Sequence, residues 1–136
     1  MSDAPDLQAL KDELEIQRVL WEYCLRLEVN TLDEWLDLFT DDTVYEVHRK
    51  ILRGRQEVSE TLALAPHGVH IGGPLRIERD GDTATTIQSY LFAADEEKFS
   101  NNGWYYRTLV RTPAGWKISH TVVKMQKRKK PEPANP

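Results

Sequence analysis

Cysteine is almost absent from this chain of 136 residues, which contains Cys24 alone. A single cysteine excludes an intrachain disulfide and any metal centre built from several thiolates. Long apolar runs are absent as well, since no stretch approaches the roughly twenty residues that cross a bilayer. The first residues carry neither the basic start nor the apolar stretch of a secretory signal. We therefore expect a cytoplasmic protein that does not associate with a membrane.

Positive charge is also scarce over most of the chain. The net charge is −4, although residues 124–136 hold five basic side chains and only one acidic side chain. The rest of the chain is therefore acidic, and an acidic surface does not bind nucleic-acid phosphates. The sequence motifs of nucleotide-binding loops, nucleophile elbows and zinc helices are missing too. We expect no nucleic-acid partner, no metal and no cofactor.

The length allows one domain with one hydrophobic core. We assign residues 7–126 to this domain. Residues 1–6 are expected to be a disordered N-terminus. Residues 127–136 are expected to form a disordered tail, because they are basic and rich in proline and show no apolar periodicity.

Helical periodicity marks the first part of the domain. Apolar residues recur at helical spacing from Leu7, which predicts a long helix over residues 6–28. Thr31 and Glu34 form a capping box that opens a second helix, closed by Asp41 and Asp42. A third helix is expected at about residues 55–64.

The sequence pattern of the second half of the chain is typical of β-strands. Alternating and β-branched residues, separated by turn signals, predict strands at residues 43–48, 51–52, 69–79, 83–94, 103–112 and 116–125. Helices followed by hairpin-connected strands indicate an α+β fold. We expect a curved antiparallel sheet that wraps around the helices and encloses an apolar pocket.

The two faces of this sheet are both partly apolar. In the strand over 103–112, Trp104 and Tyr106 alternate with Tyr105. Whichever set faces the helices, the other set exposes aromatic rings to water on the outer face. A second subunit on the outer face would cover them, which predicts a homodimer. For the strand over 83–94 the alternation leaves two interior pairs open, Ser89 with Leu91 or Tyr90 with Phe92.

The end of the first helix holds the candidate chemistry. Tyr23 and Glu28 lie about 140° apart on the helix, at the two margins of its buried face. A carboxylate at such a margin needs a partner, because an unpaired buried charge is costly. His70, in the middle of an apolar strand, is one candidate, and otherwise it is a core histidine. The other candidates are arginines, namely Arg53, Arg55 and Arg107.

Several of these residues together resemble a known family. Tyr23 and Glu28 frame a Tyr-x4-Glu motif, and Asp-Glu-Trp-Leu-Asp-Leu-Phe-Thr-Asp-Asp then runs into a strand. His70, a Gly-x-Tyr motif at 103–105 and a Gly-Trp-Lys-Ile ending at 115–118 follow in order. Over residues 10–125 the chain resembles the SnoaL-like family of the nuclear transport factor 2-like, cystatin-like superfamily. The resemblance implies a cone-shaped sheet, with three helices in the N-terminal half closing a central pocket.

Within that family the chain looks most similar to scytalone dehydratase, bile-acid 7α-dehydratase and hexachlorocyclohexane dehydrochlorinase. The carboxylate of these lyases falls on Glu28, their strand histidine on His70, and a tyrosine of the bile-acid enzyme on Tyr23. Glu28 replaces the usual aspartate. Thr121 stands where the dehydrochlorinase has an arginine, so dehydrochlorination is not expected. The substrate-binding residues implied are Tyr45, Tyr105, Leu27, Cys24, Trp35 and Thr121.

The resemblance implies a cofactor-free dehydratase, or an isomerase or polyketide cyclase with the same first step. His70 would remove a proton next to a carbonyl, Glu28 would accept the other N–H of the imidazole, and Tyr23 would donate to the developing oxyanion. The substrate implied is small and largely apolar, with a polycyclic or polyketide-like shape as one form. Two alternatives stay open. One is the non-catalytic small subunit of a ring-hydroxylating dioxygenase, and the other is a small-molecule binding module.

Overall fold

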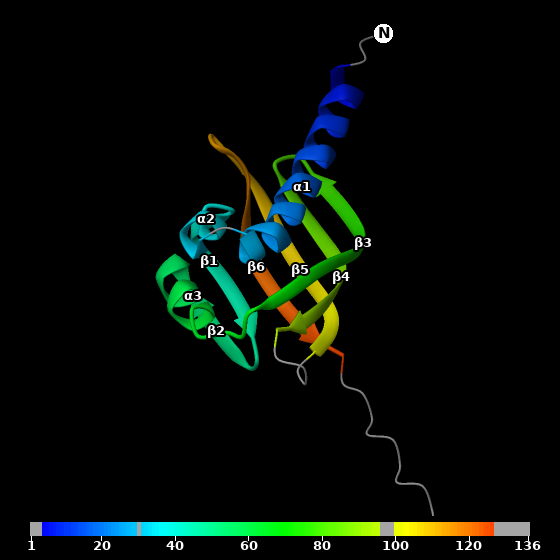
Figure 1. Ribbon diagram of the computed structural model, residues 1–136. Helices are drawn as coiled ribbons and strands as arrows, with labels where there is room; N and C mark the ends of the chain where they lie inside the picture. The colour runs from blue at the N-terminus through cyan, green and yellow to red at the C-terminus, as the bar shows by residue number, and fades with distance from the viewer. Residues whose placement is uncertain (1–3, 30, 96–99, 127–136) are drawn as a thin grey trace, which may run out of the picture.

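The computed structural model describes residues 4–29, 31–95 and 100–126 (Figure 1). The helices are α1 (Ala4–Val29), α2 (Leu32–Leu36) and α3 (Gly54–Leu62). The strands are β1 (Phe39–Val47), β2 (Lys50–Arg53), β3 (Gly68–Asp80), β4 (Thr83–Ala94), β5 (Ser100–Thr112) and β6 (Gly115–Met125). The predicted α+β order is confirmed. The predicted tail at 127–136 lies outside the described residues, and residues 4–6 belong to α1.

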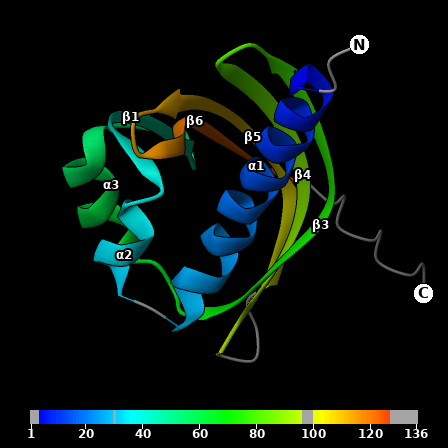
Figure 2. The ribbon, with the colours of Figure 1, turned by 90° about the horizontal axis from the view of Figure 1, so that it is seen from above.

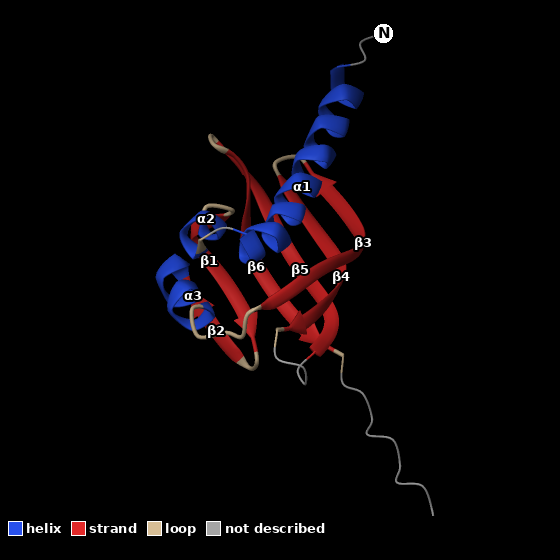
Figure 3. Cartoon of the chain, viewed as in Figure 1, coloured by secondary structure: helices blue, strands red, loops and turns tan. Residues whose placement is uncertain are grey.

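The six strands form one curved, unclosed sheet in the order β2-β1-β6-β5-β4-β3. Neighbouring strands are antiparallel except β1 and β6, which pair in parallel, so the expected purely antiparallel sheet is corrected to a mixed one. Seen from above, α1 lies across the concave side of the sheet (Figure 2). Figure 3 shows α2 and α3 beside β1 and β2. This arrangement matches the predicted cone closed by helices.

The capping box places α2 as predicted, but the helix is shorter than expected. The Thr31 hydroxyl accepts a hydrogen bond from the Glu34 amide at 3.4 Å. The helix ends at Leu36, and Asp41 and Asp42 lie within β1 instead of closing the helix. The reason is tertiary, because the chain from Phe39 onward pairs with β6 and that pairing outweighs local helix preference.

The edge strand β3 changes register at a Gly-Gly-Pro segment. Its pairing with β4 shifts between Gly72 and Leu75. Such a bulge bends a strand, and proline is tolerated on an edge because its missing N–H costs no ladder bond. A side chain at position 72 would come within 2.6 Å of the Gln88 amide nitrogen, so the Gln88 side chain would have to shift to make room for it. The bend lets the first half of β3 pass under the end of α1.

Strand parity decides which side chains face the helices. On β4 the buried residues include Tyr90 and Phe92, which settles the choice that the sequence left open. On β5 the buried set includes Tyr105 and Arg107, whereas Trp104 and Tyr106 lie on the outer face, 39% and 36% exposed. The homodimer expected across this outer face stays a prediction.

The first turns of α1 extend beyond the sheet (Figure 1). Leu7, Leu10 and Leu14 are therefore largely exposed, although their spacing predicts a buried face. The buried side of the helix begins at Asp12 and continues through Ile16 and Leu20. No helix in the described part of the chain is long and apolar enough to cross a membrane.

Asp12 fastens α1 to the hairpin of β5 and β6. It is 1% exposed, and its two carboxylate oxygens accept hydrogen bonds from Nη1 and Nη2 of Arg111, both at 2.8 Å. Gln8 and the Trp116 indole also donate to it, at 3.0 and 3.3 Å. The hydrogen bond from Arg111 is the main reason why the pKa of Asp12 lies well below its usual range. This bidentate pair fixes the angle at which the helix crosses the sheet.

We predict that Asp12→Asn lowers the free energy of unfolding by about 2–4 kcal/mol, because it leaves the Arg111 guanidinium without its buried anion. The folded-state pKa of Asp12 is depressed below the unfolded value. Its stabilisation is therefore present above about pH 4 and is lost as the pH falls further. Urea unfolding of the variant should accordingly depend less on pH than that of the wild type in acid.

Asp82→Asn is the matched control, because Asp82 is the exposed partner of the same guanidinium, 79% exposed and 2.8 Å from Arg111 Nε. An exposed ion pair contributes about 1 kcal/mol or less. Equal losses in the two variants would contradict a special role for the buried carboxylate.

Candidate functional site

A cavity of about 190 Å³ lies between the C-terminal end of α1, α2, the segment after α3, and the strands β1, β3 and β5. A cavity of about 150 Å³ holds benzene, so this one has room for a single-ring molecule. Its apolar walls come mainly from leucine, alanine and proline side chains. The polar groups in its lining are Tyr23, Arg26, Tyr45, His67, His70 and Tyr105. Among the described residues that line it, none is acidic.

Two phenol groups meet in the cavity wall. The hydroxyls of Tyr23 on α1 and Tyr45 on β1 share a short hydrogen bond, in which either group can be the donor. Both rings are nearly fully buried. Burial raises the pKa of both phenols, so they are protonated at neutral pH and available as hydrogen-bond donors.

Beneath these tyrosines lies a buried positive charge. The Arg107 side chain is 2% exposed, and its guanidinium carbon lies 4.1 Å from the ring centroids of both Tyr23 and Tyr105. Its Nη1 donates to Oε1 of Gln88 at 2.9 Å. Nε and Nη2 are buried without a hydrogen-bond partner. No carboxylate of the described residues forms an ion pair with Arg107.

His70 reaches the cavity from β3. Its ring lies 4.6 Å from the Phe92 ring, and its Nδ1 is buried without a hydrogen-bond partner. Burial lowers the pKa of the imidazole, and the nearby Glu28 carboxylate partly opposes this shift. The ring is therefore neutral near pH 7, which is the form that a general base requires.

Glu28 contacts His70, but through the main chain. Its Oε1 accepts a hydrogen bond from the backbone N–H of His70 at 2.5 Å. The expected contact between this carboxylate and the imidazole is not formed, because the main-chain amide takes the carboxylate oxygen. None of the arginines considered as alternatives takes it either. Arg55 pairs with Asp41, Arg107 bonds Gln88, and the Arg53 amide donates to Glu57.

The remaining candidate residues divide between the cavity wall and other sites. Tyr45, Tyr105 and Leu27 line the cavity, as the resemblance implies. Trp35, Cys24 and Thr121 do not.

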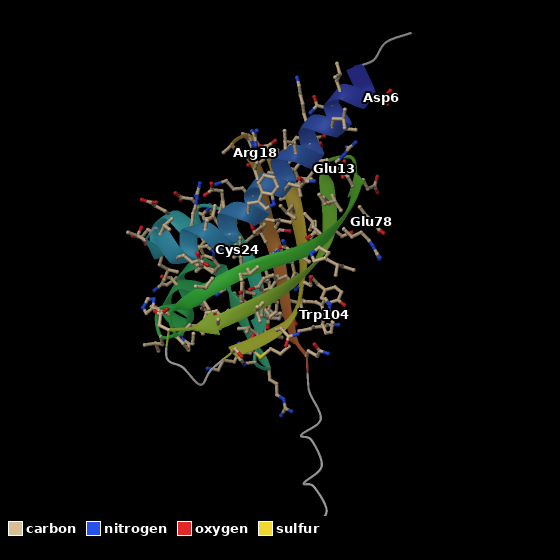
Figure 4. The ribbon with its side chains drawn as sticks, turned by 45° about the vertical axis from the view of Figure 1, so that its right-hand side comes forward. Asp6, Glu13, Arg18, Cys24, Glu78 and Trp104 are labelled. Atoms are coloured by element: carbon tan, nitrogen blue, oxygen red, sulfur yellow. The ribbon has the colours of Figure 1, made fainter. Side chains whose placement is uncertain are left out.

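Trp35 is fully buried behind the lining, with its ring 5.2 Å from that of Tyr23. Cys24 instead faces a groove where α1 crosses β3 (Figure 4), since it lies one residue round the helix from Tyr23. Thr121 is buried on the inner face opposite Arg107 in the β5–β6 register. These three residues therefore lie outside the lining of the cavity, and their contact with a substrate stays a prediction.

Arg26 is a functional candidate that the sequence analysis missed, and Arg107 is one that it considered only as a partner for Glu28. The signal for Arg107 was present, because it follows Tyr105 by two residues and must share its face of β5. Arg26 follows Tyr23 by three residues on α1, and it pairs with Glu22 at 3.0 Å. His67 lies in the cavity lining and is exposed.

No group of three or more histidine, cysteine or acidic side chains in the described ranges is arranged to hold a metal ion. The chemistry that these residues support is proton transfer and hydrogen bonding. A neutral imidazole, two phenol donors and a buried cation meet around one small cavity.

The chain is similar in sequence to a known domain family and to a mycobacterial protein. Residues 8–122 match the model of the SnoaL-like domain. An uncharacterized protein of Mycobacterium tuberculosis is 29% identical over 124 residues, which cover 83% of this chain and 84% of that protein.

Solved structures share the fold at lower identity. Hexachlorocyclohexane dehydrochlorinase type 3 from Novosphingobium barchaimii superposes with a TM-score of 0.79 at 20% identity, covering 90% of this chain and 91% of that one. A protein from Novosphingobium aromaticivorans, provisionally named scytalone dehydratase, gives 0.74 at 19% identity, with coverages of 93% and 89%. These likenesses establish the fold. Because the domain model spans most of the chain, the protein belongs to the SnoaL-like family.

Proposed function

We propose that this protein is a cofactor-free lyase of the dehydratase type, or an isomerase or cyclase that begins with the same proton abstraction. The observation that carries the proposal is the buried, unpartnered Nδ1 of His70 in the same cavity as the paired hydroxyls of Tyr23 and Tyr45. A buried polar atom without a partner costs stability, and such costs are typical of functional sites.

The first step is proton abstraction by the neutral imidazole of His70. The proton comes from a carbon next to a carbonyl, and the C–H electron pair moves to form an enolate. Burial keeps the imidazole unprotonated near neutral pH, so that it is ready to accept the proton.

The phenols then stabilise the charge that this step creates. The hydroxyl pair of Tyr23 and Tyr45 can direct one O–H at the carbonyl oxygen while the other O–H stays in the bond between them. Donors held in a dry cavity act most strongly where negative charge develops, which here is the enolate oxygen.

In a dehydration, the enolate then re-forms its carbonyl and expels a hydroxyl from the neighbouring carbon. The imidazolium returns its proton to that leaving group, which departs as water. In an isomerisation, the imidazolium instead returns the proton to a different carbon. Glu28 positions the His70 segment of β3 through its bond to the backbone N–H, and its negative charge stabilises the imidazolium.

The cavity volume narrows the proposed substrate. About 190 Å³ admits one ring in the conformation described, which favours a single-ring hydroxy-ketone over a polycyclic one. A binding module and a structural subunit of a dioxygenase stay as alternatives. Neither explains why an imidazole with an unpartnered Nδ1 and a pair of phenols bonded only to each other converge on one cavity.

We predict that His70→Ala lowers the rate of proton abstraction by about 10²–10⁴-fold, the usual contribution of a general base. The measurement is deuterium incorporation next to the carbonyl of single-ring β-hydroxyketones in D₂O, followed by NMR. His120→Asn is the matched control, because His120 pairs with Glu46 at 2.5 Å on the outer face and is remote from the cavity. Unchanged exchange in His70→Ala would end the lyase proposal.

We further predict that Glu28→Gln lowers the pKa of His70. Glutamine can still accept the backbone N–H, so the main-chain position is kept while the charge that raises the imidazole pKa is removed. Imidazole carbon-13 NMR should show wild-type His70 titrating below 6.5 and the variant titrating lower still. The base then stays active to lower pH in the variant. A pKa that rises or stays the same would show that Glu28 does not act on the imidazole.

A further inference from the structure

Arg107 has no role in the proton transfer described above, yet it is the least compensated charge in the described core. Its guanidinium is buried between two aromatic rings, with one hydrogen bond to Gln88 and two nitrogens without partners. A buried cation without a counter-ion is costly, and an apolar residue of similar volume would serve packing better. This cost calls for a compensating anion.

One place for that anion is the cavity, which is lined by the two rings that flank Arg107. The rings of Tyr23 and Tyr105 touch the guanidinium on one side and line the cavity on the other. No acidic side chain lies in that lining, and Arg26, the second arginine near it, is already paired with Glu22. The charge of Arg107 also favours the ionised forms of Tyr23, Tyr45 and Tyr105, so its field reaches the cavity wall.

We propose that Arg107 makes the cavity selective for single-ring ligands that carry an anionic oxygen, and that it acts through the tyrosine rings without touching the ligand. The inference deepens the proposed function, on whose cavity it rests, by naming the charge of its preferred ligand. Arg107 therefore acts on the ligand only through its electric field. The phenol hydroxyls remain the groups that contact the ligand.

The test uses 4-nitrophenol, whose neutral and anionic forms have the same shape and differ in visible absorption. Its apparent pKa when bound reports directly which form the cavity prefers. In the wild type this value should lie below that of the free ligand. In Arg107→Met it should rise by about one unit, which is a tenfold loss of preference for the anion.

Three variants make the result specific. Arg107→Lys keeps the positive charge and should keep most of the preference. Arg26→Met removes an arginine of the lining whose charge is already neutralised by Glu22, and should change the preference much less. His70→Ala should keep the preference although it loses proton abstraction, which separates the failure of this inference from the failure of the proposed function.

The proposal is overturned if wild-type protein binds both forms of 4-nitrophenol equally, or shows no saturable binding of either. It is overturned as well if Arg107→Met and Arg26→Met shift the bound pKa by the same amount. Equal binding of the two forms and the absence of saturable binding are both measured on the wild-type protein. The proposal can therefore be disproved even if a variant folds poorly.

Discussion

The sandwich of Arg107 between Tyr23 and Tyr105 joins the long helix to the middle of the sheet, and much of the interior is arranged around it. Tyr23 comes from α1, while Tyr105 and Arg107 come from the same face of β5. Tyr90 stacks on Tyr105 at 4.3 Å, and Trp35 packs against Tyr23 at 5.2 Å. The guanidinium thereby orients the aromatic rings that form one wall of the cavity. The flat π faces of the two tyrosines and the bond to Gln88 partly compensate the charge at this position.

A second constraint acts from the sheet edge. The bulge at Gly72 bends β3 under the end of α1, where Glu28 holds the backbone N–H of His70. The carboxylate therefore fixes the strand and leaves the imidazole without a partner. In this geometry His70 is held by its main chain and by the Phe92 ring, and its nitrogen chemistry stays free for a ligand.

The fold was largely predictable from the sequence because its signals are local. Helical spacing, the Thr31 capping box and the turn before Thr83 each specify structure within a few residues. The parallel pairing of β1 with β6 was not predictable, because it joins segments about 75 residues apart and leaves no local pattern. Because of the same pairing, Asp41 and Asp42 belong to β1, whereas the sequence predicts them at the end of the second helix.

The candidate site was predictable in part of its membership but not in its contacts. Tyr23, Tyr45, Tyr105 and His70 do share one cavity. Whether a carboxylate meets an imidazole or a main-chain amide depends on how the two side chains shift relative to each other. Helical angles and strand parity do not resolve such a shift. The buried arginine was considered only as a partner for Glu28, although parity places it on the same face as Tyr105, since a charged residue in an aromatic core runs against the usual expectation.

The most direct test of the account is a crystal structure with a single-ring phenolate bound as a mimic of the enolate. The account predicts the ligand oxygen at about 2.5–3.2 Å from the hydroxyl of Tyr23 or Tyr45, with the adjacent ring carbon about 3–3.5 Å from an imidazole nitrogen of His70. A ligand bound instead in the groove between α1 and β3, or in the cavity with its oxygen turned away from both tyrosines, would contradict it.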